Sequence, residues 1–145
     1  VGKRIYATAS SLQQELIYIH QFAKEFPNSG TLKKLLTTFS KRLHKRKNLV
    51  SDPEILMAIL TEIALGSPKC YPIVLQLCSV LINKLSTTSE REKIVNDIYK
   101  KFQMIPNIGE LQIWPMFQMW YYGIMIGSQI NIRMHSLNIK FAQTG

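Results

Sequence analysis

The chain has 145 residues, of which 46% are hydrophobic and 19% are charged; this composition excludes a disordered or fibrous protein and fits a single domain over residues 1–145. Its formal net charge of +9 is uneven, because residues 1–50 hold ten Lys and Arg against Glu15 and Glu25, whereas residues 51–145 hold eight against seven acids. Such a concentration of cations in one third of the sequence indicates a face that meets a polyanion.

The first two predicted helices follow one another across a Pro-Asn-Ser-Gly turn. Ser10 and Ser11, each with a glutamine three residues on, are typical of a helix start, and apolar residues at helical spacing continue to about Glu25. Residues 27–30 then end this helix and cap the next. The second helix carries its apolar residues within an arc of about 100°, the width of a core-facing stripe. These residues are Leu32, Leu35, Leu36, Phe39 and Leu43.

The same second helix is predicted to be cationic on the side away from its apolar stripe. Lys34, Lys41 and Lys45 cluster there with further cations beside them, and the cations at the C-terminal end also complement the helix dipole. A surface of this kind neutralises phosphates and releases their counterions without reading bases, although a lysine-rich helix face is often simply solvated. The predicted nucleic-acid-binding residues are Lys33, Lys34, Lys41, Arg42, Lys45, Arg46 and Lys47.

Three more helices follow. Asp52 suits an N-cap with Pro53 at the first helical position, and Gly66-Ser67-Pro68 ends the helix that they begin. A fourth helix begins near Tyr71-Pro72 and is apolar on most of its circumference, which is typical of a central helix. Thr88, Ser89 and Glu92 predict a capping box for a fifth.

A six-residue pattern links two of the predicted turns. Pro27-Asn28-Ser29-Gly30-Thr31-Leu32 recurs as Pro106-Asn107-Ile108-Gly109-Glu110-Leu111, which fits helix pairs stacked in the manner of HEAT repeats. Pro, Asn and Gly also recur at helix joints in general, so a compact helical bundle without repeats stays open. The predicted fold class is all-α with five to seven helices, regular over residues 10–114.

Residues 115–145 give no clean helical stripe, and their packing is not predicted. The uncharged stretch from Leu111 to Ile132 is broken by Pro115, two glycines and polar residues, and this argues against a membrane span. Its aromatic and methionine content is typical of a core or a subunit contact. The residues expected at a partner contact are Trp114, Phe117, Trp120 and Tyr121.

No catalytic or metal centre is predicted. The only two aspartates, Asp52 and Asp97, lie 45 residues apart, no glycine-rich phosphate loop is present, and His20, His44 and His135 lie in no nucleophile motif. The cysteines, Cys70 and Cys78, lack zinc-site spacing and lie about two helical turns apart, which predicts buried thiols in a reducing, cytoplasmic compartment.

Several segments together resemble the helical region that follows the polymerase core in bacterial retron-like and abortive-infection (phage-defence) reverse transcriptases. The resemblance covers about residues 10–114, and its most specific pieces are Ile63-Ala64 with Pro68 and Tyr71-Pro72, and Ile105-Pro106-Asn107 with Gly109 and Ile113-Trp114. The chain departs from the family pattern at Pro115-Met116-Phe117, where Leu-Gln-Arg would be expected after the Trp.

The resemblance implies a thumb or accessory domain of an RNA-directed DNA polymerase. The catalytic Tyr-x-Asp-Asp motif and its Mg²⁺ would then lie upstream in a longer chain, of which this sequence is expected to be a fragment without a cofactor of its own. Implied partners are an RNA or RNA–DNA duplex, the polymerase core and a partner protomer. Two alternatives remain: a protein–protein interaction or oligomerisation scaffold that makes no nucleic-acid contact, and a stand-alone basic helical protein.

Overall fold

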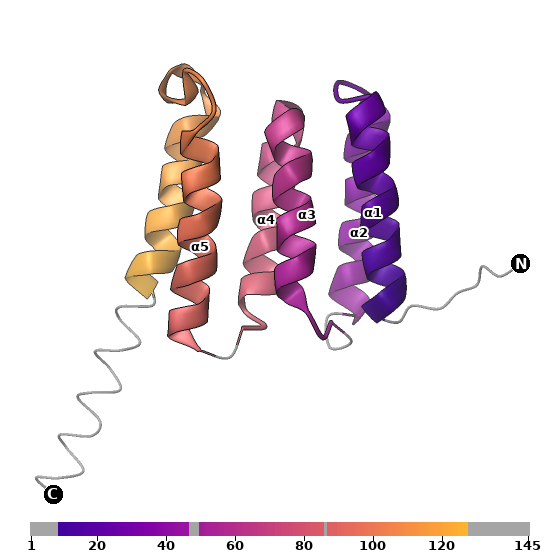
Figure 1. Cartoon of the computed structure of the whole chain (residues 1–145), viewed down its shortest axis with the longest axis horizontal. Coiled ribbons are helices and arrows are strands. Elements are labelled where there is room, and N and C mark those ends of the chain that lie inside the picture. The colour runs from indigo at the N-terminus through magenta and orange to yellow at the C-terminus, as the bar shows by residue number, and fades with distance from the viewer. Residues whose placement is uncertain (1–8, 47–49, 86, 128–145) are drawn as a thin grey trace, which may run out of the picture. The chain divides into compact units, whose positions relative to one another are not determined.

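The protein is all-α, as the sequence predicts. The computed structural model describes residues 9–46, 50–85 and 87–127, and within these ranges every regular element is a helix. The elements are α1 (Ala9–Glu25), α2 (Gly30–Arg46), α3 (Pro53–Gly66), η2 (Pro68–Cys70), α4 (Tyr71–Ile82), α5 (Thr88–Gln103) and η3 (Ile108–Glu110) (Figure 1). One more α-helix runs over residues 113–127. The six α-helices of the described part fall within the predicted five to seven.

Side-chain caps fix where the helices begin. Ser29 Oγ accepts the Thr31 N–H at 3.1 Å before α2, and Asp52 Oδ1 accepts the Ile55 N–H at 3.4 Å before α3. The cap of α5 is Thr87, whose Oγ1 accepts the Glu90 N–H at 3.1 Å, so the capping box predicted from Thr88, Ser89 and Glu92 begins one to two residues too late. An N-cap needs non-helical dihedral angles, and Thr87 is extended (φ −121°, ψ 151°), whereas Thr88 is already in the helix.

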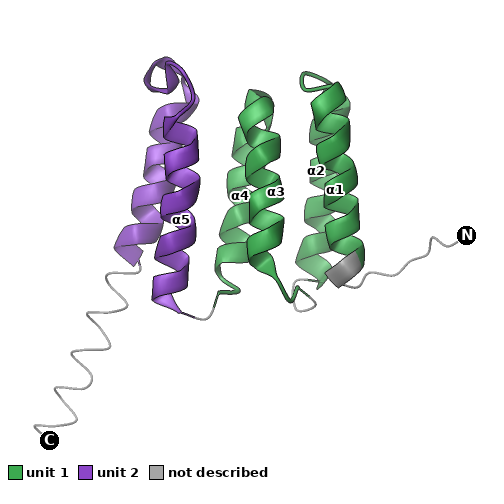
Figure 2. Cartoon of the chain, viewed as in Figure 1, with its two compact units in different colours: residues 1–86 green, residues 87–145 purple. Residues whose placement is uncertain are grey.

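The chain groups into two compact units, residues 1–86 and 87–145 (Figure 2). In the first unit α1 packs on α2 and on α3, while α4 packs on α3 and on α2, so two helix pairs stack into two layers (Figure 1). One layer contains α1 and α3, and the other contains α2 and α4. The short η2 joins α3 to α4, and because it also contacts α2 we count it with the second layer. Side chains from all four helices fill the space between the layers, among them Leu12, Leu16, Ile19, Leu36, Phe39, Leu43, Leu60, Ile63, Leu77, Cys78 and Leu81.

The second unit is built from α5, η3 and the helix over residues 113–127. The packing left unpredicted for residues 115–145 is therefore helical as far as residue 127, and residues 128–145 lie outside the described residues. Pro115 does not disturb this helix because it lies in the first turn, where a backbone N–H has no intrahelical partner. Val95, Ile98 and Phe102 of α5 are buried with Phe117 of the final helix.

The repeated Pro-Asn-x-Gly-x-Leu pattern marks two helix joints of different conformation. Gly30 begins α2 directly, whereas Gly109 lies in η3, and Asn107 adopts a left-handed conformation (φ 59°) that no other described non-glycine residue shares. Leu32 is fully buried, but Leu111 is 38% exposed. The two segments thus share turn-forming residues and not one local structure.

Both cysteines are buried free thiols, as predicted. Burial in apolar surroundings raises the pKa of Cys78 to about 12, and burial also raises the pKa of Cys70. Among the described residues, no helix combines the length and apolar character that crossing a bilayer requires.

Candidate nucleic-acid interface

Helix α2 is two-sided. Lys34, Lys41 and Lys45 are exposed, and at 100° per residue they fall within an arc of about 40° on the side away from the buried Leu36 and Leu43. With a rise of 1.5 Å per residue, Lys34 and Lys41 are about 10 Å apart along the axis, and Lys41 and Lys45 about 6 Å. We call these three residues the basic ridge. The apolar stripe of α2 anchors the helix to its unit and leaves the ridge facing solvent.

The predicted flanking residues have different surroundings. Arg42 forms an ion pair with Glu15 of α1, so its charge is partly neutralised and its guanidinium is drawn away from the basic ridge. Lys33 lies on the flank of the ridge opposite to Arg42. Burial raises the pKa of Cys70, and the charge of Lys33 opposes this rise, so Lys33 lies close to Cys70 and therefore beside η2. Arg46 is half-buried, and Lys47 lies outside the described residues.

Helix stability alone does not favour the cations at these positions. Lys33 and Lys34 are close to the N-terminus of α2, where the helix dipole is positive and cations are unfavourable by about 0.3–1 kcal/mol. Lys41 and Lys45 are like charges at spacing i, i+4, which costs about 0.2–0.5 kcal/mol. Only His44, Lys45 and Arg46 in the last turn complement the dipole. The ridge therefore concentrates positive charge at a small cost to the fold.

One basic residue of the same surface was missed by the sequence analysis. Lys69 is exposed in η2, and η2 contacts α2. Lys69 is next to Cys70 in the sequence, and the charge of Lys33 is near enough to Cys70 to oppose the rise that burial causes in the pKa of its thiol. Because 36 residues separate Lys33 from Lys69 in the sequence, only the pairing of α2 with η2 brings them together. No local sequence signal could have identified Lys69.

The residues expected at a partner contact mostly serve the core of the second unit. Phe117 is only 1% exposed and packs against Phe102 with ring centroids 4.4 Å apart, so the expected contact role of Phe117 is corrected to a core role. Trp114, Trp120 and Tyr121 are half-buried around it, and Tyr99 contacts the Tyr121 ring at 4.0 Å between centroids. The contacts explain why the aromatic content of this segment is high.

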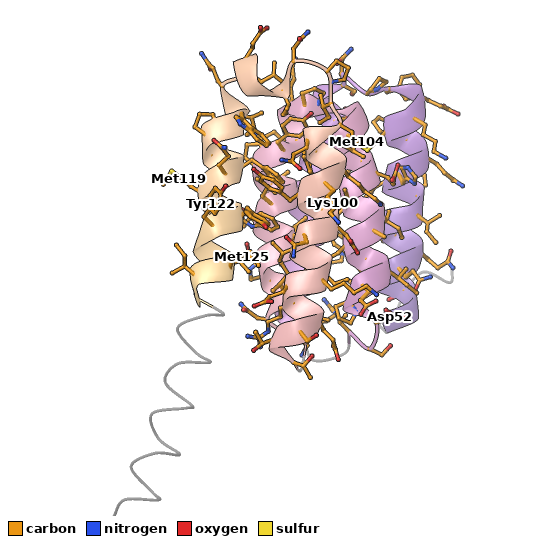
Figure 3. All side chains as sticks on the ribbon, turned by 60° about the vertical axis from the view of Figure 1, so that its left-hand side comes forward. Asp52, Lys100, Met104, Met119, Tyr122 and Met125 are labelled. Carbon is orange, nitrogen blue, oxygen red and sulfur yellow. The ribbon has the colours of Figure 1, made fainter. Side chains whose placement is uncertain are left out.

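A different face of the final helix is exposed and apolar. Met119 is 76% exposed, and Tyr122 lies beside it on the outer side of the helix (Figure 3). Met116 and Ile126 share this face at helical spacing and are 39% and 58% exposed. The helix carries no charged residue between positions 113 and 127.

The described residues hold no group of three or more His, Cys, Asp or Glu placed to bind a metal ion. Partial burial lowers the pKa of His20, and the charge of Lys24 lowers it further while Glu62 opposes both. His44 Nδ1 donates to the Ser40 carbonyl oxygen one turn earlier at 2.8 Å. His135 lies outside the described residues.

No protein-family model matches the chain, and no curated protein or solved structure proved similar to it. The likeness to reverse-transcriptase helical regions remains a prediction from the sequence.

Proposed function

We propose that the chain is a nucleic-acid-binding helical domain that holds phosphates through the basic ridge of α2. The observation that carries this proposal is the alignment of Lys34, Lys41 and Lys45 on one exposed line of a helix whose opposite side is buried. Three ammonium groups spread over about 16 Å suit a polymer with regularly spaced charges better than a small anion, which would meet one or two of them. Contacts of this type give affinity and position, not base specificity.

The resemblance to polymerase-associated helical regions supports a narrower proposal. In that setting the domain would lie beside the core of an RNA-directed DNA polymerase and position RNA or an RNA–DNA duplex for a catalytic centre elsewhere. In this narrower proposal the chain contributes the binding and positioning of phosphates, and the three lysines of the basic ridge act as cations. Reading the coding sequence upstream of Val1 for a polymerase palm with Tyr-x-Asp-Asp tests this narrower proposal.

The binding proposal is tested by titrating the chain into a labelled RNA–DNA duplex at several salt concentrations. Four phosphates held by the ridge and Lys33 predict that the logarithm of the binding constant falls with the logarithm of salt concentration at a slope of roughly −3 to −4. A slope near zero, or no detectable binding to duplex or structured RNA at low salt, contradicts the proposal.

A second candidate function is protein–protein interaction through the final helix. The exposed apolar face with Met119 and Ile126 favours it, because methionine and aromatic side chains are enriched at interfaces. Static light scattering tests for self-association: a molar mass that doubles with concentration supports this function, and a strict monomer argues against it. Met119→Lys is the matched variant, since it removes apolar area without touching the buried ring cluster.

A further inference from the structure

The two layers of the first unit separate its charges. Every acidic residue of residues 1–86 lies on α1, on α3 or at the cap of α3, and none lies in α2, η2 or α4. These acids are Glu15, Glu25, Asp52, Glu54 and Glu62. The acid-free layer instead contains six Lys and Arg in α2, with Lys69 in η2 and Lys84 just after α4. The cations therefore extend from α2 to both ends of α4, although α4 itself carries no charged residue.

The cations of this layer form two groups, one toward each end. In Figure 1, α2 and α4 run in the same direction, so η2 lies at the end where α2 begins, and Lys84 follows α4 at the end where α2 finishes. Lys33, Lys34 and Lys69 make up the first group. The second group lies toward the other end and contains Lys41, Lys45 and Lys84.

Between the two groups the surface is uncharged but polar. About 10 Å of helix separates Lys34 from Lys41, and the exposed Thr38 lies in this interval on α2. On α4 the exposed Gln76 lies midway between Lys69 and Lys84. Both side chains can exchange hydrogen bonds with the hydroxyl groups and base edges inside a groove.

The layer lacks what a single strand needs. Proteins that bind single strands stack successive bases on exposed aromatic rings. Phe39 and Tyr71 are at most 1% exposed, and the one exposed aromatic ring of α2, η2 and α4 is the imidazole of His44, which is a single platform and not a row of rings. Two groups of cations on either side of an uncharged strip match instead two rows of phosphates bordering a groove, such as the wide, shallow minor groove of an A-form helix, which displays hydroxyl groups and base edges.

We infer that the α2–η2–α4 layer is a duplex-binding surface, in which Lys69 and Lys84 hold phosphates together with the lysines of α2. This inference rests on the proposed function and extends it to a second helix and to one class of nucleic acid. Each cation group holds the backbone of one strand, and Thr38 and Gln76 face the groove between them.

The test measures fluorescence anisotropy of the whole chain with a short RNA–DNA hybrid duplex and with its two separated strands. Tight binding of the duplex and weaker binding of either strand are expected. With Lys69 and Lys84 added to the four contacts considered above, the salt slope of the unaltered chain should be roughly −5 instead of −3 to −4. Lys69→Gln and Lys84→Gln should each make this slope shallower by about 0.9, because each removes one phosphate contact. Lys24→Gln, on the acidic layer, is the matched control and should leave the slope unchanged; circular dichroism verifies that all variants fold.

The outcomes separate this inference from the proposed function. If Lys34→Gln and Lys41→Gln weaken binding while Lys69→Gln and Lys84→Gln do not, phosphate binding by the ridge of α2 is supported and the larger α2–η2–α4 surface is refuted. Equal or tighter binding of single strands refutes the duplex assignment alone. Displacement of the duplex by poly-glutamate at equal charge concentration points to an acidic protein partner and overturns the inference. Absence of binding to all probes removes both proposals.

Discussion

Reversing the charge of Lys41 should strengthen the fold and weaken binding at the same time. Lys41 lies in the middle of the basic ridge, is exposed, and has Lys45 as its i+4 neighbour. Lys41→Glu removes a repulsion of about 0.2–0.5 kcal/mol and adds a Glu–Lys pair of similar size in the favourable orientation. The free energy of unfolding should therefore rise by about 0.4–1 kcal/mol, with an increase of roughly 1–4 °C in Tm.

The same substitution replaces attraction to a phosphate by repulsion. At a separation of about 4 Å in water each term is about 1 kcal/mol, so affinity for the duplex should fall by about 2 kcal/mol, or roughly 30-fold. Chemical denaturation measures the stability change, and anisotropy at low salt measures the affinity. Lys24→Glu near the C-terminus of α1 is the matched control: it places an acid at the negative end of a helix dipole, so it should lower stability slightly and leave binding unchanged.

A result in which Lys41→Glu raises stability and leaves duplex affinity unchanged would falsify the binding argument. It would mean that the ridge is a solvated helix face whose lysines do not contact nucleic acid. A loss of both stability and binding would instead show that Lys41 makes a structural contact, which contradicts the exposed position that the argument requires.

Three further predictions concern the fold. Phe117→Ala should lower the free energy of unfolding by about 3–5 kcal/mol in chemical denaturation because it empties the centre of the ring cluster, whereas Met119→Ala on the exposed face should change it by less than about 0.5 kcal/mol. The lowered pKa of His20 means that the unfolded chain binds more protons near pH 6, so stability should fall as pH drops through and below 6.5; His20→Gln should flatten this dependence, and an unchanged slope in the variant contradicts it. Cys70 and Cys78 should react with a thiol reagent at neutral pH only after denaturant is added, since both are buried and their thiols stay protonated; rapid reaction of the folded chain would show that α4 opens.

Most helices that could be predicted are those in which polar and apolar residues alternate with helical period, whereas α4 was predicted from an apolar run that begins near Tyr71-Pro72. In α2 the lysines and the leucines occupy opposite sides, so both the helix and its orientation follow from the sequence. The final helix could not be found in this way, because Met116, Met119 and Ile126 make its outer face as apolar as its inner face. Without polar contrast, the period that identifies a helix is lost.

The candidate site was only partly predictable, for a reason that lies in the pairing of helices. Arg42 belongs to the same cationic run as the ridge, yet Glu15 lies 27 residues earlier and meets it through the α1–α2 pairing. Lys69 shows the converse, since it is an isolated cation in its own segment and joins the surface only through the contact of η2 with α2. Spacing along one helix indicates which residues share a side of that helix, but not which neighbouring helix lies beside it.

The two-layer arrangement explains why, in the described part of the chain, Arg42 is paired with an acid while the lysines of the basic ridge are not. Stacking α1 on α3 and α2 on α4 places the acids of the first unit in one layer and leaves the other without any, so a cation that leans toward the acidic layer is neutralised. Arg42 leans that way and is paired, while Lys34 and Lys45 point outward from the acid-free layer and keep their full attraction for an anion. A polyanion should therefore approach from the α2–α4 side, because the acids of α1 and α3 repel it from the opposite side.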